Sequence, residues 1–238
     1  MSGLFRFKQF SVDQTSCAMK INTDGVLLGA IAGEGSPVSV LDIGTGTGVI
    51  ALMLAQRFKG AMIDAVEIDV RAAETAAFNF RNSPFKERLK IYPMSFAGFC
   101  DDHSEKRYDL IVSNPPFYIN SLESPESKRT LAKHSASGFF EELITGVSVM
   151  LSESGKCWLI LPPKTATDVK PMAAVNGLYL HQQINIKSFA GSKPHREILC
   201  MGFNDPSGMK AQEFVIYDSP GVYTAAYKEL LAPYFLNF

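Results

Sequence analysis

Hydrophobic residues recur along the chain in short runs that alternate between strand spacing and helix spacing. The run VSVLDIG from Val38 is followed by a glycine-rich turn and by GVIALMLAQRF, whose apolar residues recur at helical spacing up to Phe58. A second apolar run, AMIDAVEID, precedes the alanine-rich segment RAAETAAFNFRN, which Pro84 ends. Further strands are predicted at Leu89–Met94, Tyr108–Ser113, Lys156–Leu161, Leu178–Ile186 and Glu197–Phe203, and further helices at Phe139–Leu151 and Thr165–Val175. This alternation predicts an α/β fold with a mostly parallel sheet and helices on both faces.

Two segments flank this alternating region. We expect residues 1–37, which contain FRFKQF, to form a small N-terminal cap of β or loop structure over the site, and residues 38–238 to form the main domain. The closing sequence EFVIYDSPGVYTAAYKELLAPYFLNF predicts a short strand, a turn and a terminal helix within that domain. A chain of 238 residues suits one large α/β domain.

The charge and hydropathy of the chain restrict how it could bind nucleic acid or membranes. The 23 lysines and arginines nearly balance the 24 aspartates and glutamates, so the net charge of -1 creates no field that attracts nucleic acid or membrane to the whole surface. Any phosphate binding has to be local. The N-terminus lacks the apolar stretch of a secretory signal, and no apolar run approaches the roughly 18 residues needed to span a bilayer, so we expect a cytoplasmic protein without a membrane partner.

The first chemical signal is the sequence DIGTGTG, in which Asp42 precedes Gly44, Gly46 and Gly48. Glycines at the junction of strand and helix let backbone N–H groups approach a ligand at the carboxyl end of a parallel sheet. The spacing departs from the GxGxxG of nicotinamide-binding loops and from the GxxxxGK[ST] of nucleoside triphosphate loops. A carboxylate at Asp42 would repel a pyrophosphate but could accept hydrogen bonds from the ammonium group of S-adenosylmethionine.

The second signal is Glu67, which ends the second predicted strand. An acid there can accept hydrogen bonds from both hydroxyls of a ribose, in an NAD enzyme as well as in a methyltransferase. We expect Ile68 to flank the adenine ring of the same ligand.

The third signal is the sequence SNPPFY, which follows the strand YDLIV. The two prolines end the strand and stiffen the backbone, so that Asn114 projects its amide from a fixed position. If the Asn114 side-chain oxygen and the Pro115 carbonyl accept both hydrogens of an aromatic amine, its nitrogen lone pair can point at a sulfonium methyl group. Phe117 can stack on the base, a contact worth about 1–3 kcal/mol, and Tyr118 can line the same pocket.

The order DxGxGxG, a strand-ending acid and NPPF resembles the S-adenosylmethionine-dependent amino-methyltransferases. The segments FRFKQF, Met19-Lys20 and TDGVLLG, together with the closing YTAAYKELLAPYFL, are similar to the bacterial tRNA1(Val) adenine-N6 methyltransferases, which modify the adenine 3′ of the anticodon. The resemblance covers nearly the whole chain. It implies a Rossmann-like class I methyltransferase fold with a seven-stranded sheet, S-adenosylmethionine as the cofactor, and N6 of adenine 37 in tRNA1(Val) as the methyl acceptor.

Site residues carried over from this resemblance fall into two groups. The cofactor site would comprise Thr23, Asp24, Gly25, Asp42, Gly44, Gly46, Gly48, Glu67, Ile68 and Ser95, where Ser95 stands in place of the acid that related enzymes use to bind the adenine amino group. The catalytic pocket would comprise Asn114, Pro115, Pro116 and Phe117.

Basic residues supply candidate RNA contacts. They are Lys128, Arg129, Lys133 and His134 after the NPPF motif, and a second stretch, Lys193 to Arg196. The aromatic Tyr118 is a further candidate substrate contact beside the first stretch. The chain's histidines and cysteines show no metal-ligand spacing, and we expect no metal and a monomeric enzyme.

Alternative functions remain open at this point. The NPPF motif would also suit methylation of a guanine N2 in ribosomal RNA or of a protein glutamine amide. A third alternative is a non-catalytic factor that binds S-adenosylmethionine and RNA.

Overall fold

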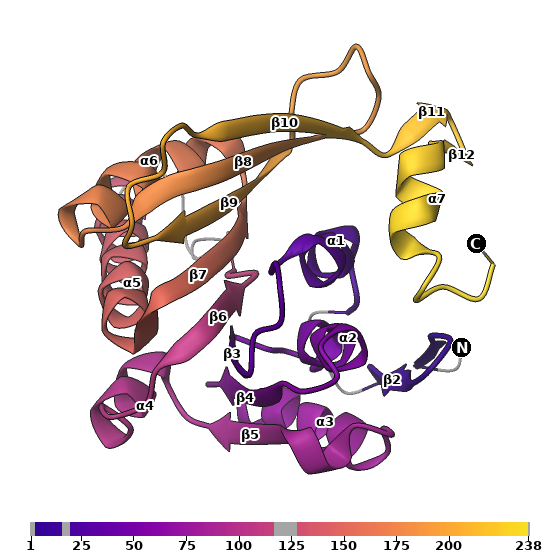
Figure 1. Cartoon of the computed structure of the whole chain (residues 1–238), viewed down its shortest axis with the longest axis horizontal. Coiled ribbons are helices and arrows are strands. Elements are labelled where there is room, and N and C mark those ends of the chain that lie inside the picture. The colour runs from indigo at the N-terminus through magenta and orange to yellow at the C-terminus, as the bar shows by residue number, and fades with distance from the viewer. Residues whose placement is uncertain (1–2, 16–19, 117–127, 238) are drawn as a thin grey trace.

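A large mixed sheet forms the centre of the molecule (Figure 1). The computed structural model describes residues 3–15, 20–116 and 128–237, with the backbone alone for 128–137. The sheet has eight strands in the order β10-β8-β9-β7-β6-β3-β4-β5. Neighbouring strands are parallel except where β9 pairs with β7 and β8. The strands are β3 Ser39–Ile43, β4 Met62–Glu67, β5 Leu89–Pro93, β6 Tyr108–Ser113, β7 Leu151–Leu161, β8 Tyr179–Lys187, β9 Arg196–Gly202 and β10 Lys210–Val215.

The predicted fold class is confirmed, but the sheet has one strand more than the seven that the resemblance implied. The additional strand is β10, which pairs in parallel with β8 at the edge of the sheet, from Lys210 beside Gln182 to Val215 beside Lys187. The short strand predicted at the start of EFVIYDSPGVYTAAYKELLAPYFLNF overlaps the end of β10. The first four residues of β10 are exposed and show little of the alternation that identifies a strand.

Helices cover both faces of the sheet, as predicted. Helices α1 Thr23–Ile31, α2 Val49–Arg57, α3 Val70–Arg81 and α7 Ala225–Leu231 contribute to the hydrophobic core of one face, and α4 Phe96–Asp102, α5 Lys128–Met150 and α6 Pro163–Val175 to that of the other (Figure 1). Successive strand residues point to opposite faces, so Val40 packs in the first core and Leu41 in the second. A strand between two cores is apolar at nearly every position, which is the pattern seen in the sequence.

The N-terminal segment consists of a hairpin and a helix. Strands β1 Leu4–Arg6 and β2 Ser11–Asp13 pair, and Phe7 forms a bridge with Phe235 from the C-terminal end of the chain. Helix α1 was not predicted, because its residues 25–30 are all buried and therefore lack the polar face of an amphipathic helix. The division of the chain at residue 37 stays a prediction.

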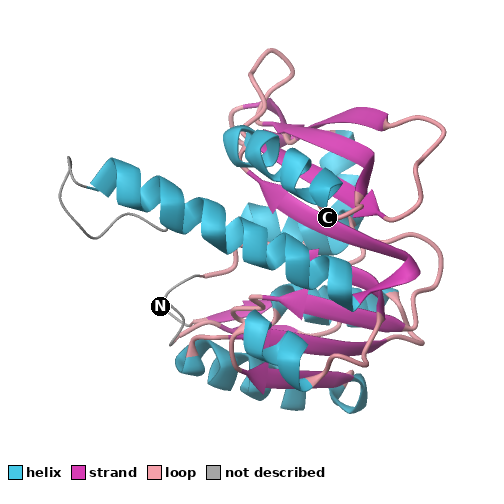
Figure 2. Ribbon diagram, turned by 90° about the vertical axis from the view of Figure 1, so that its left-hand side faces the viewer, coloured by secondary structure: helices cyan, strands magenta, loops and turns pink. Residues whose placement is uncertain are grey.

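Two further elements differ in extent from the prediction. Helix α5 begins at Lys128 instead of Phe139, and its amino-terminal end projects from the body of the molecule (Figure 2). Its first residues, KRTLAKHSAS, carry too few apolar side chains to show helical spacing. The structure also contains the unpredicted helix α4, the 3-10 turn Lys86–Arg88 and the small C-terminal hairpin of β11 Tyr217–Ser219 and β12 Val222–Tyr223.

Candidate active site

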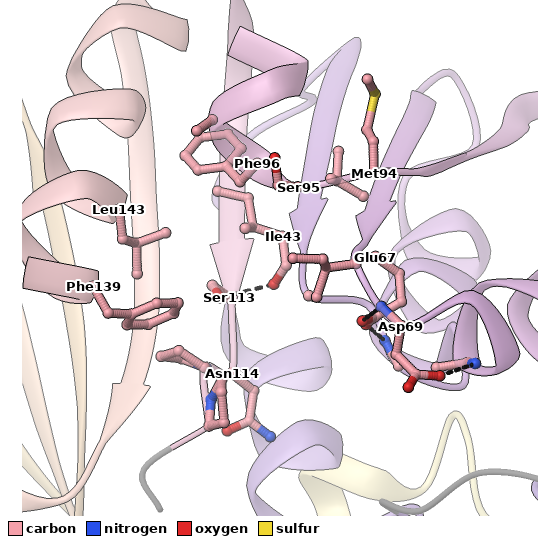
Figure 3. A pocket seen from close by; sticks show the side chains of 18 of the residues that line it. Ile43, Glu67, Asp69, Met94, Ser95, Phe96, Ser113, Asn114, Phe139 and Leu143 are labelled. Atoms are coloured by element: carbon pink, nitrogen blue, oxygen red, sulfur yellow. Dashed lines mark hydrogen bonds between the residues drawn. The ribbon is translucent and has the colours of Figure 1, made fainter. Parts of the chain in front are cut away.

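A cavity lies at the carboxyl ends of the parallel strands β3, β4, β5 and β6 (Figure 3). Its volume is about 390 Å³, within the range of roughly 300–1,000 Å³ found for small-molecule sites. The segment that follows each strand contributes to the wall, and α5 closes it. The wall segments are Ile43 to Gly46 without Thr45, Val66 to Asp69, Met94 to Ala97 and Ser113 to Pro116, with Ala72 of α3 and Phe139, Glu142 and Leu143 of α5.

The glycine loop supplies one wall of the cavity. Gly44, Gly46 and Gly48 have φ angles of 68°, 58° and 82°, which side chains disfavour. A Cβ atom added at Gly44 or Gly46 would meet no atom of the described residues within 4 Å, so the loop leaves open space among them. Gly48 lies away from the cavity wall and starts α2, and a Cβ at this position would lie 2.5 Å from Phe80 Cε1. Gly44 and Gly46 therefore present bare backbone to the cavity, and their predicted contact with a cofactor stays a prediction.

Asp42 lies beneath this loop and is fully buried. Its Oδ2 accepts hydrogen bonds from Thr45 Oγ1 at 2.6 Å and from the Ala51 backbone N–H at 3.1 Å. Its Oδ1 has no hydrogen-bond partner among the described residues. Burial raises the pKa of Asp42 to about 7, against the opposing effect of the two hydrogen bonds. Asp42 therefore holds the loop, and its predicted contact with an ammonium group stays a prediction.

Glu67 joins the end of β4 to the glycine loop. Its Oε2 accepts a hydrogen bond from the Gly46 N–H at 2.8 Å, and its Oε1 accepts one from the Asp69 N–H at 2.9 Å. A carboxylate has about four acceptor positions, so these two bonds leave capacity for two hydroxyl donors from the cavity. Ile68 also lines the cavity and is 71% exposed.

Asn114 stands across the cavity from Glu67 (Figure 3). It lines the wall with Pro115 and Pro116, and Ser113 Oγ fixes the end of β6 by donating to the Ile43 carbonyl at 2.8 Å. The side-chain oxygen of Asn114 is buried and has no hydrogen-bond partner among the described residues. An acceptor in this condition is available to a donor from a ligand or from water. Phe117 and Tyr118 lie outside the described residues.

The Thr23-Asp24-Gly25 segment starts α1 beside Asn114. Gly25 lies beside Asn114, because a Cβ built on it would lie 3.8 Å from Asn114 Nδ2. Asp24 Oδ2 accepts a hydrogen bond from Arg196 Nε at 2.6 Å, so the carboxylate ties α1 to β9. None of the three lines the cavity of Figure 3. Their predicted place near the cofactor stays a prediction.

Ser95 lines the cavity, and its oxygen already accepts one hydrogen bond from the protein, so its predicted contact with the cofactor's adenine stays a prediction. It caps α4 by accepting a hydrogen bond from the Gly98 N–H at 3.1 Å. The apolar side chains that α5 contributes to the wall of the cavity, Phe139 and Leu143, were not predicted (Figure 3). Their spacing of four residues marks a buried helix face, but that signal does not distinguish a core from a cavity.

The candidate RNA contacts lie on two segments. Lys128, Arg129, Lys133 and His134 belong to the first turns of α5, where side chains are outside the described part of the chain. In the second stretch, Lys193 is exposed and Arg196 is engaged with Asp24. Burial lowers the pKa of His195, and Arg196 lowers it further.

We also searched the described residues for membrane-spanning helices and for metal sites. No helix among them is long and apolar enough to cross a membrane. Within the same residues, no group of three or more histidine, cysteine, aspartate or glutamate side chains is arranged to hold a metal ion.

Comparison with known proteins defines the class. Residues 23–174, which are more than half of the chain, match the family model described as the methyltransferase small domain. A solved structure from Agrobacterium tumefaciens, described as a predicted O-methyltransferase, shares the fold with a TM-score of 0.68 and 17% identity, covering 89% of this chain and 96% of that one. The protein is therefore a methyltransferase, and the cofactor of this class is S-adenosylmethionine, as predicted.

Two relatives identify the family within the methyltransferases. A Pedobacter heparinus protein named tRNA1(Val) (adenine(37)-N6)-methyltransferase is 50% identical over 240 residues, which cover 100% of both chains. A protein of the same name from Bacteroides thetaiotaomicron is 40% identical over 98% of this chain and 97% of its own. The chain belongs to the tRNA1(Val) (adenine(37)-N6)-methyltransferase family, which confirms the family predicted from the sequence.

Proposed function

We propose that this protein transfers a methyl group from S-adenosylmethionine to the exocyclic N6 of adenine 37 in the anticodon loop of tRNA1(Val). The proposal is supported by the family to which the chain belongs and by full-length relatives of that name. One observation in the structure carries it: the buried Asn114 Oδ1 has no partner among the described residues and belongs to a residue that lines the same cavity as Glu67 and the glycine loop.

The cavity residues fit the cofactor. Gly44 and Gly46 would hold its amino acid part against the bare loop, and Glu67 would accept hydrogen bonds from its ribose hydroxyls. When bound, S-adenosylmethionine supplies an electrophilic methyl group on a positively charged sulfur. Asn114 Oδ1, which has no partner among the described residues, would be an acceptor for the amine that receives this methyl group.

Asn114 and the Pro115 carbonyl would act by orienting the amine that receives the methyl group. The lone pair of an aromatic amine is delocalised into the ring, and hydrogen bonds from both of its hydrogens to these two acceptors would turn the lone pair toward the methyl carbon. In this transfer the bond from the nitrogen to the methyl carbon would form as the carbon–sulfur bond breaks, and the nitrogen would then lose one proton. Because the amine becomes acidic only after it has gained the methyl group, water can accept that proton.

RNA binding belongs to the same proposal. Lys128, Arg129, Lys133 and His134 would contact the tRNA backbone from the projecting end of α5, and adenine 37 would leave its stack to reach Asn114. The predicted monomeric state and cytoplasmic location are also retained as part of the proposal.

Transfer of a labelled methyl group to unmodified tRNA1(Val) tests the proposal. The wild-type protein should methylate this tRNA, and it should not methylate a transcript with guanine at position 37. The Asn114→Ala variant should transfer at least about 100-fold more slowly, the loss typical of removing one hydrogen-bonding group from a reacting centre. Its affinity for S-adenosylmethionine, measured by calorimetry, should stay within a few fold, since Asn114 is assigned to the acceptor base.

Asn82→Ala is the matched control, because Asn82 is an exposed amide at the end of α3 and outside this cavity. It should leave the rate unchanged. Equal transfer by wild type and Asn114→Ala would contradict the assigned role of Asn114, and methylation of the guanine 37 transcript would contradict the proposed acceptor.

A further inference from the structure

Glu142 is the acidic residue that α5 brings to the cavity, and the sequence motifs gave it no role. One face of α5 carries Phe139, Glu142, Leu143 and Gly146 at helical spacing. The first three line the cavity. Gly146 packs on α4 so closely that an added Cβ would lie 2.5 Å from Phe96 Cε1. This contact places the Glu142 turn of α5 next to the start of α4.

The part of the cavity between α4 and α5 is apolar. Its walls come from Met94 and Phe96 on one side and from Phe139 and Leu143 on the other (Figure 3). A flat aromatic ring fits such walls with its faces and keeps its polar edge for groups at the rim. The proposed function places the cofactor's ribose at Glu67 and its methyl group at Asn114. The adenine ring of the cofactor would then lie in the apolar space between α4 and α5.

The polar edge of adenine needs an acceptor for its amino hydrogens. Ser95 is the weaker candidate, because its uncharged hydroxyl oxygen has two acceptor positions and one of them already accepts the hydrogen bond that caps α4. Glu142 is exposed, lines the cavity and forms no ion pair with any described residue. Its carboxylate has only acceptor positions to offer.

We propose that Glu142, from α5, recognises the amino group of the cofactor's adenine, in place of an acid after β5. This inference rests on the proposed function, since it takes S-adenosylmethionine as the ligand. Glu142 then selects the cofactor by its base. A base with an oxygen at position 6 would bring one acceptor against another, and binding would weaken.

Binding constants for two ligands test this selection. S-adenosylhomocysteine carries the amino group, and S-inosylhomocysteine has an oxygen in its place. Calorimetry with the wild-type protein should show about tenfold or greater preference for the adenosyl compound, the size expected for one hydrogen bond to a charged group. Glu142→Ala should reduce this preference to within about threefold by weakening adenosyl binding. Glu142→Gln should bind the inosyl compound better than wild type does, because an amide can also donate.

Two control variants separate this role from general effects. Glu141→Gln removes the same charge from the neighbouring exposed glutamate, which does not line the cavity, and should keep the wild-type preference. Ser95→Ala should lower the melting temperature through loss of the α4 cap and also keep the preference.

An unchanged preference in both Glu142 variants would overturn the inference while leaving the proposed function intact. Loss of the preference in Ser95→Ala alone would give the role to Ser95 instead. Failure of the wild-type protein to bind either compound would overturn the proposed function together with this inference.

Discussion

Replacing Asp42 by asparagine should change how the stability of the protein depends on pH. The carboxyl group is fully buried, and burial raises its pKa from 3.8 to about 7. The folded protein therefore binds this proton more tightly than the unfolded chain does. The stabilising contribution is complete below about pH 3.8 and is lost as the pH rises through about 7.

The size of the effect follows from the two pKa values. A difference of about three pH units corresponds to about 4 kcal/mol as an upper limit, and about 2–3 kcal/mol of it develops between pH 5 and pH 8. Asparagine has nearly the same shape and can still accept the hydrogen bonds from Thr45 and the Ala51 N–H, but it does not ionise. Relative to wild type, Asp42→Asn should thus gain about 2–3 kcal/mol in free energy of unfolding between pH 5 and pH 8.

Urea unfolding at pH 5, 6, 7 and 8 measures this difference. The comparison between variants is needed because burial also lowers the pKa of His181 and His195, and these groups change stability with pH in the opposite sense. Asp168→Asn, the same substitution on the exposed surface of α6, should follow the wild-type profile. Parallel profiles for wild type and Asp42→Asn would refute the raised pKa and the burial argument behind it.

Two other pairs of variants test the fold around the site by urea unfolding. Gly48→Ala should lower the free energy of unfolding by more than about 2 kcal/mol, because it combines a φ of 82° with a clash against Phe80. Gly44→Ala has open space among the described residues, so its backbone conformation alone should lower the free energy of unfolding by about 1–2 kcal/mol. Equal losses would show that the contact with Phe80 is relieved without cost. Arg88→Met should lower the free energy of unfolding by about 2–4 kcal/mol, because the guanidinium donates to three backbone carbonyls in and just after the last turn of α2. Its control Lys86→Met removes an exposed ion pair with an N–O distance of 4.0 Å and should change the free energy of unfolding by less than about 0.5 kcal/mol. A small loss for Arg88→Met would mean that water replaces those bonds.

Much of the site could be predicted from the sequence because its chemistry is local. Positive φ angles in the glycine loop, the acid at the end of β4 and the prolines that end β6 are each written in a few consecutive residues. In a parallel sheet these strand ends meet at one edge, so Gly44, Glu67 and Asn114 line one cavity although they are far apart in the sequence.

The rest depended on which elements pack together. Asp24 and Arg196 are 172 positions apart, and only the placement of α1 against β9 brings them within 2.6 Å. Phe139 and Glu142 belong to a helix whose apolar spacing is the same whether it faces a core or a cavity. The contacts of Asp42 also come from tertiary structure, because Thr45 and the start of α2 donate hydrogen bonds to one of its oxygens and bury the residue.

The sequence by itself thus determined the alternation of the main strands and helices, the family and the backbone chemistry of the loops, because neighbouring residues impose those properties on each other. Helices α1 and α4 were not part of that prediction. Tertiary structure alone decided the apolar wall from α5, the neighbours of each buried charge and the pKa of Asp42. These properties come from contacts and solvent exclusion between distant segments, which no local pattern records.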